Sequence, residues 1–281
     1  MSKILGDQRT WSIKERWNGN APDCLFVSAF DGFDAYIGTL PLTERKNYRI
    51  GLQPNSSKFD YIIKDLRRIP DQHIYPVFRE EFTRVGTAEI EMWDCNYYLK
   101  APNISSYTED DAIAKSVLEE VEINEKLMKY PHPNLAVYLG CIVHNGLIVR
   151  LAFRKYFQTL SERTLNTKSA ADFTAQDRTI CMDNIEAAAA YLHQQGLAHN
   201  DISPHNIMFD TNDMPVLIDL DACAPIGSKL KKGGSVAGWR GPLADNGKMF
   251  KMASVECDEL AIKYLRRWLT DELVVAHGST E

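Results

Sequence analysis

The sequence predicts a two-lobed α+β protein, and three observations lead to this prediction. Strand-like apolar runs are frequent as far as residue 154, with helical patterns between them. Helical periodicity dominates after that residue. The 281 residues, of which 44% are hydrophobic and 25% are charged, are enough for two packed lobes of ordinary globular composition. A β-rich part followed by a mainly helical part is typical of an α+β fold.

The first 67 residues combine strand and helix signals. Residues 24–30 (CLFVSAF) and 34–40 (DAYIGTL) predict two strands joined by a short turn. Residues 58–70 follow with apolar side chains at positions i, i+3, i+4 and i+7. This spacing predicts an amphipathic helix that ends near Pro70.

The next part predicts strands on both sides of a long helix. Residues 109–129 form the helical pattern, because Ile113, Val117 and Val121 lie along one stripe and acidic residues near the start favour the helix dipole. The strands before this helix are expected at 81–85, 88–93 and 96–102, and those after it at 135–143 and 146–153.

The last part of the chain predicts two helices and one buried strand. Residues 177–196 carry apolar side chains on one face, and Gly196 is a typical residue just past a helix end. Residues 214–223 (MPVLIDLDAC) predict a short buried strand. Residues 255–269 predict a late amphipathic helix.

Charge and composition exclude several classes of partner. The net charge of −6 gives no electrostatic reason to expect nucleic acid or an anionic membrane surface. No apolar run approaches the roughly 18 residues that a membrane-spanning helix needs. The beginning of the chain has no apolar signal-peptide region, and the six cysteines are scattered without a C-x-x-C pair. We therefore expect an intracellular protein, cytoplasmic or nuclear.

The stretch LAHNDISPHNIMFD, residues 197–210, carries the chemistry. Asp201 and Asn206 stand five residues apart after His199, and Asp219 follows on the predicted strand. Phosphoryl transfer needs such a set, with one carboxylate to accept the proton of a hydroxyl and an amide and a second carboxylate as oxygen ligands for Mg²⁺. Mg²⁺ takes its remaining ligands from phosphates and water. The spacing therefore predicts Asp201 as the base and Asn206 and Asp219 as metal ligands.

Two upstream residues are expected to complete this set. Lys100 ends the strand-like run NYYLK, and Glu120 lies within the predicted helix. A lysine placed in a cleft is costly unless it is paired, so Glu120 and the α- and β-phosphates of ATP would give it partners. On their own, the two residues would more simply be a surface lysine and a surface glutamate on unrelated elements.

With these residues, the chain resembles the eukaryotic protein kinase fold. Lys100, Glu120, PHPNLAVYLGC, HNDISPHN, LIDLD and GWRGP occur in the order of that fold, and several segments are similar to kinase-domain proteins of filamentous fungi. The resemblance covers roughly residues 68–270. It implies an N-terminal extension over 1–67, an ATP-binding β-rich lobe over 68–153 and a helical lobe over 154–281 that is shortened after the helix carrying Asp258.

The resemblance also implies roles for further residues. ATP would contact Lys100, Gly86 in the phosphate loop, and Ala152 and Phe153 in the hinge near 152–154. Asp258 would brace the backbone of the catalytic loop, and residues 219–242 would form the activation segment. We also expect His199 to orient the loop from within the core.

The chain departs from the kinase pattern at several positions. Gly86 is alone where several glycines usually allow close approach to phosphates. Asn200 and Ser203 stand where an arginine and a lysine are usual, so two cations are missing. Leu220 and Asp221 replace the phenylalanine and glycine that usually follow the metal-binding aspartate.

The predicted function is that of an ATP- and Mg²⁺-dependent phosphotransferase, most simply a Ser/Thr-type protein kinase acting on a protein substrate. The alternatives are a nucleotide-binding pseudokinase without turnover and a small-molecule kinase of the aminoglycoside or choline type. A zinc site formed by His193, His199 and His205 is a further alternative, although the segment Gly196–Pro204 interrupts any helix that could align them.

Overall fold

The computed structural model describes residues 9–18, 21–44, 63–86, 96–165, 172–237 and 247–277. The chain divides into two compact units. The first unit comprises residues 1–94, 99–119 and 140–152, and the second comprises 95–98, 120–139 and 153–281. Within the described ranges, the first unit is built mainly of strands and the second carries the long helices α9 and α10, in agreement with the predicted α+β class.

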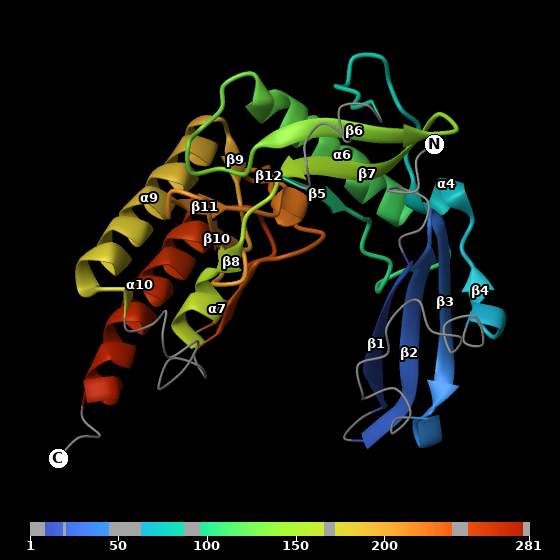
Figure 1. The fold of residues 1–281 in the computed structure, drawn as a ribbon, viewed down its shortest axis with the longest axis horizontal. Coiled ribbons are helices and arrows are strands. Elements are labelled where there is room, and N and C mark those ends of the chain that lie inside the picture. The colour runs from blue at the N-terminus through green and yellow to red at the C-terminus, as the bar shows by residue number, and fades with distance from the viewer. Residues whose placement is uncertain are drawn as a thin grey trace. The chain divides into compact units, whose positions relative to one another are not determined.

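The first unit begins with an antiparallel sheet of order β1-β2-β3-β4, drawn in blue and cyan in Figure 1. The predicted strands at 24–30 and 34–40 are confirmed as parts of β2 and β3. Strand β1 was not predicted, although Trp11 and Ile13 alternate with polar residues as a half-buried strand requires. The strands are β1 (Arg9–Asn18), β2 (Ala21–Asp31), β3 (Asp34–Pro41) and β4 (Arg67–Arg68), with the short 3-10 helix η1 at Leu42–Glu44.

Residues 58–62 of the helix predicted over 58–70 lie outside the described residues. Residues 63 and 64 are helical, but the predicted end near Pro70 is wrong. Residues 67 and 68 are already extended, as strand β4, and Arg68 pairs with Tyr36 of β3. The backbone N–H of Ile69 continues this pairing and donates to the Ala35 carbonyl at 2.8 Å. Cross-strand pairing therefore overrides helical spacing at this point.

Helix α6 (Ala112–Met128) confirms the helix predicted over 109–129, but it starts three residues later. The acidic residues expected in its first turn precede it, and the Asp110 carboxylate accepts a hydrogen bond from the Ala112 N–H at 3.0 Å. The predicted stripe is confirmed at Ile113 and Val121, which are buried. Helix α6 contributes residues to both units.

A second sheet has the order β5-β7-β6. Strands β6 and β7 confirm the two strands predicted after the helix, and the turn between them has positive φ at Asn145 (50°) and Gly146 (76°), as a tight hairpin turn requires. Strand β5 confirms the strand predicted at 96–102. The bounds are β5 (Tyr97–Lys100), β6 (Tyr138–His144) and β7 (Leu147–Arg154), and the short helix α4 covers Asp71–Ile74.

The strand predicted at 81–85 is wrong, and the one predicted at 88–93 lies outside the described residues. Residues 81–85 make a single bridge, between Arg84 and Cys141, in place of a ladder. Their approach to β6 depends on Gly140, whose φ is 134° and where a Cβ atom would lie 2.8 Å from the Thr83 carbonyl oxygen. Phe82 and Val85 are buried as residues of a strand would be, but the segment does not pair as a strand.

Arg150 of β7 joins the N-terminal sheet to the rest of the first unit. Its side chain is 5% exposed, and its guanidinium donates to the Val149 carbonyl at 2.7 Å and to the Gly32 carbonyl at 2.9 Å. It also lies over the rings of Phe30 and Phe33, at 5.0 and 5.4 Å from their centres. The turn between β2 and β3 is therefore held by a buried cation.

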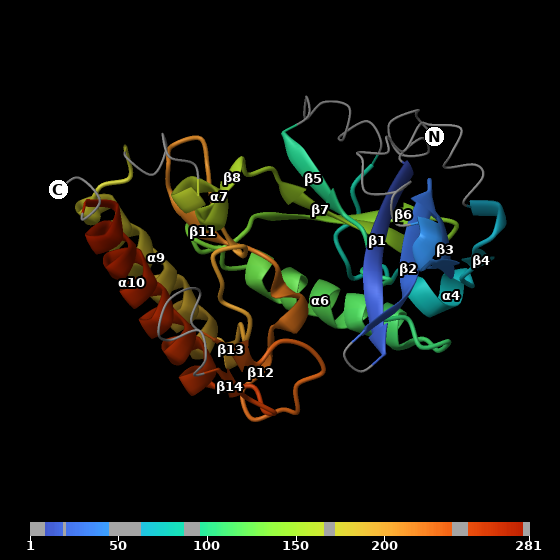
Figure 2. The ribbon, with the colours of Figure 1, turned by 90° about the horizontal axis from the view of Figure 1, so that it is seen from below.

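The second unit is built around helices α9 (Ala175–Gln194) and α10 (Val255–His277), which lie side by side in Figures 1 and 2. Both confirm predicted helices. Thr174 and Asp177 form a reciprocal capping box at the start of α9, and Gly196, with a φ of 75°, follows its end. The predicted apolar face of α9 is buried in the core of this unit at Cys181, Ile185, Ala188 and Leu192.

Short elements surround the two helices. The strand predicted over 214–223 is confirmed only for Pro215–Leu217, because the chain turns at Asp219. Strands β8, β10 and β11 form one sheet, β9 pairs with β12, and β13 pairs with β14. The bounds are β8 (Gln158–Thr159), α7 (Leu160–Leu165), β9 (Leu197–Ala198), β10 (Ile207–Phe209), β11 (Pro215–Leu217), η2 (Leu220–Ala222), β12 (Ala224–Pro225), β13 (Ser235–Val236) and β14 (Lys248–Met249).

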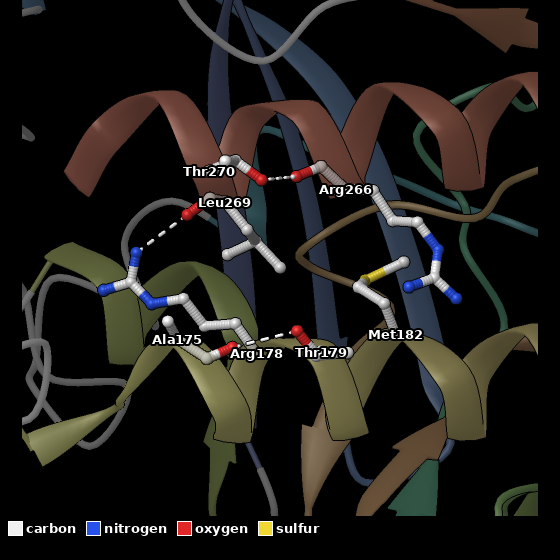
Figure 3. A pocket seen from close by; sticks show the side chains of 7 residues that line it. All are labelled: Ala175, Arg178, Thr179, Met182, Arg266, Leu269 and Thr270. Atoms are coloured by element: carbon white, nitrogen blue, oxygen red, sulfur yellow. Dashed lines mark hydrogen bonds between the residues drawn. The ribbon is translucent and has the colours of Figure 1, made fainter. Parts of the chain in front are cut away.

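A groove of about 240 Å³ lies between α9 and α10 (Figure 3). Arg178 crosses it and donates to the Leu269 carbonyl at 2.8 Å, while Met182 and Leu269 line its apolar part. None of its lining residues belongs to the predicted site, so we assign it a packing role. In the part of the chain that the structure describes, no helix is long and apolar enough to span a membrane.

Replacing Arg150 by Met is expected to lower the free energy of unfolding by about 2–4 kcal/mol. The change removes two charge-assisted hydrogen bonds and the cation above two rings, and it leaves buried carbonyls without their donor. Urea denaturation measures the loss. Arg154→Met is the control, because Arg154 lies in the same strand but is exposed. Equal stabilities of the two variants would contradict the role of Arg150.

Candidate active site in the loop between β9 and β10

The predicted chemical residues gather around one loop of the second unit. Residues 199–206 connect β9 to β10, directly after α9. The hairpin of β10 and β11 then returns the chain to Asp219, and the Ile218 N–H donates to the Asn206 carbonyl at 2.9 Å. The hairpin thereby brings Asn206 and Asp219 together although thirteen residues separate them.

The loop backbone is held by one buried carboxylate. Asp258 of α10 is fully buried, and it accepts hydrogen bonds from the N–H groups of His199 at 2.8 Å and Asn200 at 2.7 Å. The oxygen that accepts from His199, Oδ2, also lies 2.9 Å from Nε2 of His193 on α9. A buried carboxylate is tolerated because these donors replace water. Asp258 therefore joins both long helices to the loop.

His199 orients the loop from inside the core. It is fully buried, its Nε2 lies 3.1 Å from the Ile218 carbonyl oxygen, and its Nδ1 lies 3.3 Å from the Asp201 N–H. Because a carbonyl can only accept, Nε2 carries the proton and Nδ1 accepts the bond from Asp201. The imidazole thus links the Ile218 carbonyl, just before Asp219, to the backbone of Asp201.

Asn206 fixes the carboxylate of Asp201. Its Nδ2 donates to the Asp201 carbonyl oxygen at 2.8 Å and to the Asp201 carboxylate at 2.9 Å. The amide nitrogen is thus used within the loop, and the carboxamide oxygen points to the opposite side of the group. The loop holds a defined carboxylate beside an amide oxygen.

Asp219 occupies a left-handed turn, with a φ of 65° and a ψ of 83°. Such a backbone is uncommon outside glycine, and asparagine and aspartate tolerate it best. The turn begins the 3-10 helix η2, and the Asp219 carboxylate accepts the Asp221 N–H at 3.4 Å. This turn follows the end of strand β11 at Leu217, so Asp219 takes no part in the pairing of β10 with β11.

Burial raises the pKa of Asp201, and the negative charges of Asp219 and Asp221 raise it further. His199 and the hydrogen bond from Asn206 act in the opposite direction. The net direction is upward, so Asp201 holds a proton more firmly than an exposed carboxylate does. A base of raised pKa suits proton acceptance from a hydroxyl.

Asn200 was predicted only as a missing cation, but its amide has three partners of its own. The residue is 1% exposed and has a φ of 61°. Its Nδ2 donates to the carbonyls of Ala198 at 2.7 Å and Ala222 at 3.1 Å, and its Oδ1 accepts the Ser254 N–H at 3.3 Å. The amide therefore connects the loop to η2 and to the start of α10 through hydrogen bonds alone.

The residues present fit a Mg²⁺ ion bound together with phosphates. Among the described residues, no group of three or more His, Cys, Asp or Glu side chains could hold a metal by itself. Mg²⁺ does not need one, because it binds through one or two protein oxygens plus substrate phosphates and water. Asn206 and Asp219 would supply those two oxygens, since the carboxamide nitrogen of Asn206 is committed to Asp201.

The remaining predicted residues are distributed over both units. Lys100, at the end of β5, is half-buried and belongs to the first unit, whereas Glu120 in α6 is buried and belongs to the second. Gly86 is exposed and belongs to the first unit. Ala152 and Phe153 are buried in β7, one on each side of the division. The pairing of Lys100 with Glu120 and the contacts with ATP stay predictions.

The three histidines considered for zinc do not converge. His193 points to Asp258 and His199 to the Ile218 carbonyl, while His205 is exposed. A zinc site would need these imidazole nitrogens to face a common point. The geometry instead uses two of the histidines to support the loop.

Comparisons with known proteins agree with this geometry. A family model described as protein kinase domain matches residues 90–242. The serine/threonine-protein kinase PAK mbt of Drosophila melanogaster is 29% identical over 136 residues, which are 46% of this chain and 20% of that protein. The MAP kinase kinase kinase SSK2 of Saccharomyces cerevisiae is 27% identical over 128 residues, 46% of this chain and 8% of that protein. The match thus spans a fifth or less of these relatives.

Replacing Asp258 by Ala is expected to lower the free energy of unfolding by about 3–5 kcal/mol, because two buried N–H groups lose their acceptor. Asp258→Asn keeps one acceptor oxygen and is expected to lose less. Urea denaturation measures both changes. Glu259→Ala is the control, since Glu259 is the next residue of α10 and is exposed. A loss below about 1 kcal/mol in Asp258→Ala would contradict the anchoring role.

Proposed function

Because the chain belongs to the protein kinase domain family, whose model matches more than half of it, we propose that it is an ATP- and Mg²⁺-dependent kinase that phosphorylates hydroxyl groups of a protein substrate. The serine/threonine type is inferred from relatives such as the serine/threonine-protein kinase PAK mbt. The narrower resemblance to filamentous-fungal proteins stays a prediction.

The observation that carries the proposal is the hydrogen-bonded pair of Asp201 and Asn206. The amide fixes the carboxylate at 2.9 Å and leaves its own oxygen for a cation on the other side. A base and a metal ligand held in one rigid loop meet the two needs of phosphoryl transfer, which are positioning of the hydroxyl and neutralisation of phosphate charge.

In the proposed reaction, Asp201 orients the acceptor hydroxyl and takes its proton. The hydroxyl oxygen bonds to the γ-phosphorus of ATP, the bond from that phosphorus to the β–γ bridging oxygen breaks, and ADP leaves. Asn206 and Asp219 would hold Mg²⁺, which would neutralise phosphate charge. Lys100 would contact the α- and β-phosphates, and Glu120 would pair with Lys100. Asp258 and His199 keep the loop in shape.

The proposal assigns different functions to different segments of the chain. Residues 68–153 would bind ATP, together with Gly86, Ala152 and Phe153, and residues 154–281 would carry the catalytic loop and activation segment. Residues 1–67 would be an extension of unassigned function. We also propose an intracellular location, because the cysteines that the structure describes are free thiols.

A nucleotide-binding pseudokinase is the second candidate, and the missing cations favour it. Asn200 is neutral, and Ser203 is buried where a lysine would reach the transferring phosphate. Without those charges, less transition-state charge is stabilised and turnover falls. Binding and transfer must therefore be measured separately.

Asp201→Asn is expected to reduce phosphate transfer by at least about a hundredfold, because it removes the base. Mg·ATP binding should change by less than about threefold, because Asp201 is not among the proposed metal ligands. Incubation with labelled ATP and Mg²⁺ measures transfer to the chain itself or to a generic protein, and isothermal titration measures binding.

Asp172→Asn serves as the matched control for this experiment, because Asp172 is exposed and lies outside the loop. Transfer by Asp201→Asn at the wild-type rate would refute the assignment of the base. Binding of Mg·ATP without transfer by the wild-type chain would identify the pseudokinase.

Asp219→Ala is expected to weaken Mg²⁺-dependent nucleotide binding by at least about tenfold, because one of two protein oxygens for the ion is lost. Binding measured with EDTA in place of Mg²⁺ should be the same for this variant and for the wild type. If the Mg²⁺ dependence of binding is unchanged in Asp219→Ala, Asp219 is not a metal ligand.

A further inference from the structure

The four residues Lys229–Lys232 (KLKK) look in the sequence like a solvated basic run, but their lysines differ in the structure. Lys229 and Lys231 are exposed. Lys232 is half-buried, and its Nζ lies 3.0 Å from the carboxylate of Asp221. One lysine of the run therefore faces the carboxylate of Asp221, two residues after Asp219.

Two glycines directly after Lys232 fix its position. Gly233 and Gly234 have φ values of 69° and 76°. A Cβ atom on Gly233 would lie 2.7 Å from the Asn200 carbonyl oxygen, and one on Gly234 would clash with the Phe250 carbonyl. The Gly234 N–H donates to the Asn200 carbonyl at 2.7 Å. The backbone after Lys232 thus packs directly against the catalytic loop.

The same segment is also bonded to the chain before α10. The Leu230 N–H donates to the Lys251 carbonyl at 2.9 Å, and the Phe250 N–H donates to the Gly234 carbonyl at 2.7 Å. Strands β13 and β14 continue this pairing. Lys232 therefore belongs to a hydrogen-bonded segment held from two sides.

Asp221 is the partner that makes this placement relevant to the site. Its backbone N–H donates to the Asp219 carboxylate at 3.4 Å, and its negative charge acts on Asp201. Three carboxylates thus influence one another, while the proposed metal site uses only Asp219. A third carboxylate without a cation would compete for Mg²⁺.

We propose that Lys232 is a positioning residue that neutralises Asp221 and thereby locks the segment 229–236 against the catalytic loop and reserves the metal for Asp219 and Asn206. This inference rests on the proposed function for its meaning, because the reserved ion is the one that would accompany ATP. The lock itself is a property of the chain without nucleotide.

The experiment compares Lys232→Met with Lys229→Met in the full chain without nucleotide. Electron paramagnetic resonance measures the affinity for Mn²⁺ as a probe of the metal site, and hydrogen exchange measures the protection of the Gly234 amide. In Lys232→Met, Mn²⁺ affinity is expected to rise about three- to tenfold, because the carboxylate of Asp221 becomes available to the ion. Exchange at Gly234 is expected to accelerate by a similar factor, because the segment loses its ion pair.

Three variants make the result specific. Lys229→Met should match the wild type in both measurements, and Lys232→Arg should restore both to within about twofold because it keeps the charge. Adding Asp221→Asn to Lys232→Met should abolish the gain in Mn²⁺ affinity. A Lys232→Met chain that keeps the wild-type value in either measurement overturns the proposal. A wild-type chain that does not bind Mg·ATP refutes the proposed function instead, because neither measurement here uses nucleotide.

Discussion

The carboxylate of Asp258 is the contact on which the candidate site depends. It is fully buried and accepts the N–H groups of His199 and Asn200, so it determines where the loop begins. His193 binds the same carboxylate from α9, which ties the two long helices to one charge. A buried carboxylate is costly without hydrogen-bond donors. The burial of Asp258 in α10 and the conformation of the loop that supplies the donors therefore depend on each other.

Around this loop, hydrogen bonds from a neutral side chain connect the segments at a position where an arginine is usual. The amide of Asn200 reaches Ala198, Ala222 and Ser254, and so spans three segments without adding charge. The amide does not ionise and is not screened by salt, whereas a buried arginine would need a carboxylate or a phosphate as partner. The loop conformation is therefore fixed by hydrogen bonds within the folded chain. Less positive charge is then available to stabilise the negative charge that develops in a transition state.

The part of the site made of residues close in sequence could be predicted. The part made by hydrogen bonds between residues far apart in sequence could not. Asp201 and Asn206 are close in sequence, so their placement together in one loop could be predicted. The partners of Asn200 lie up to 54 residues away, and nothing in its neighbourhood indicates them. The same limit applies to the fold: the burial of residues 81–85 resembles that of a strand, but they form a single bridge, between Arg84 and Cys141, next to the close approach that Gly140 allows. Burial patterns report which side faces the core, and they do not report which backbone groups are paired.

The placement of three aspartates near one another shows why the surrounding backbone must be so strongly constrained. Like charges at short range favour separation or protonation. Burial is the main cause that raises the pKa of Asp201, and repulsion from Asp219 and Asp221 adds to it. The left-handed turn at Asp219 and the amide of Asn206 oppose the repulsion by fixing where two of the carboxylates lie. The third, Asp221, meets Lys232. Backbone conformation and hydrogen bonding therefore keep together a set of charges that would otherwise move apart, and this negative charge would attract the divalent cation of the proposed site.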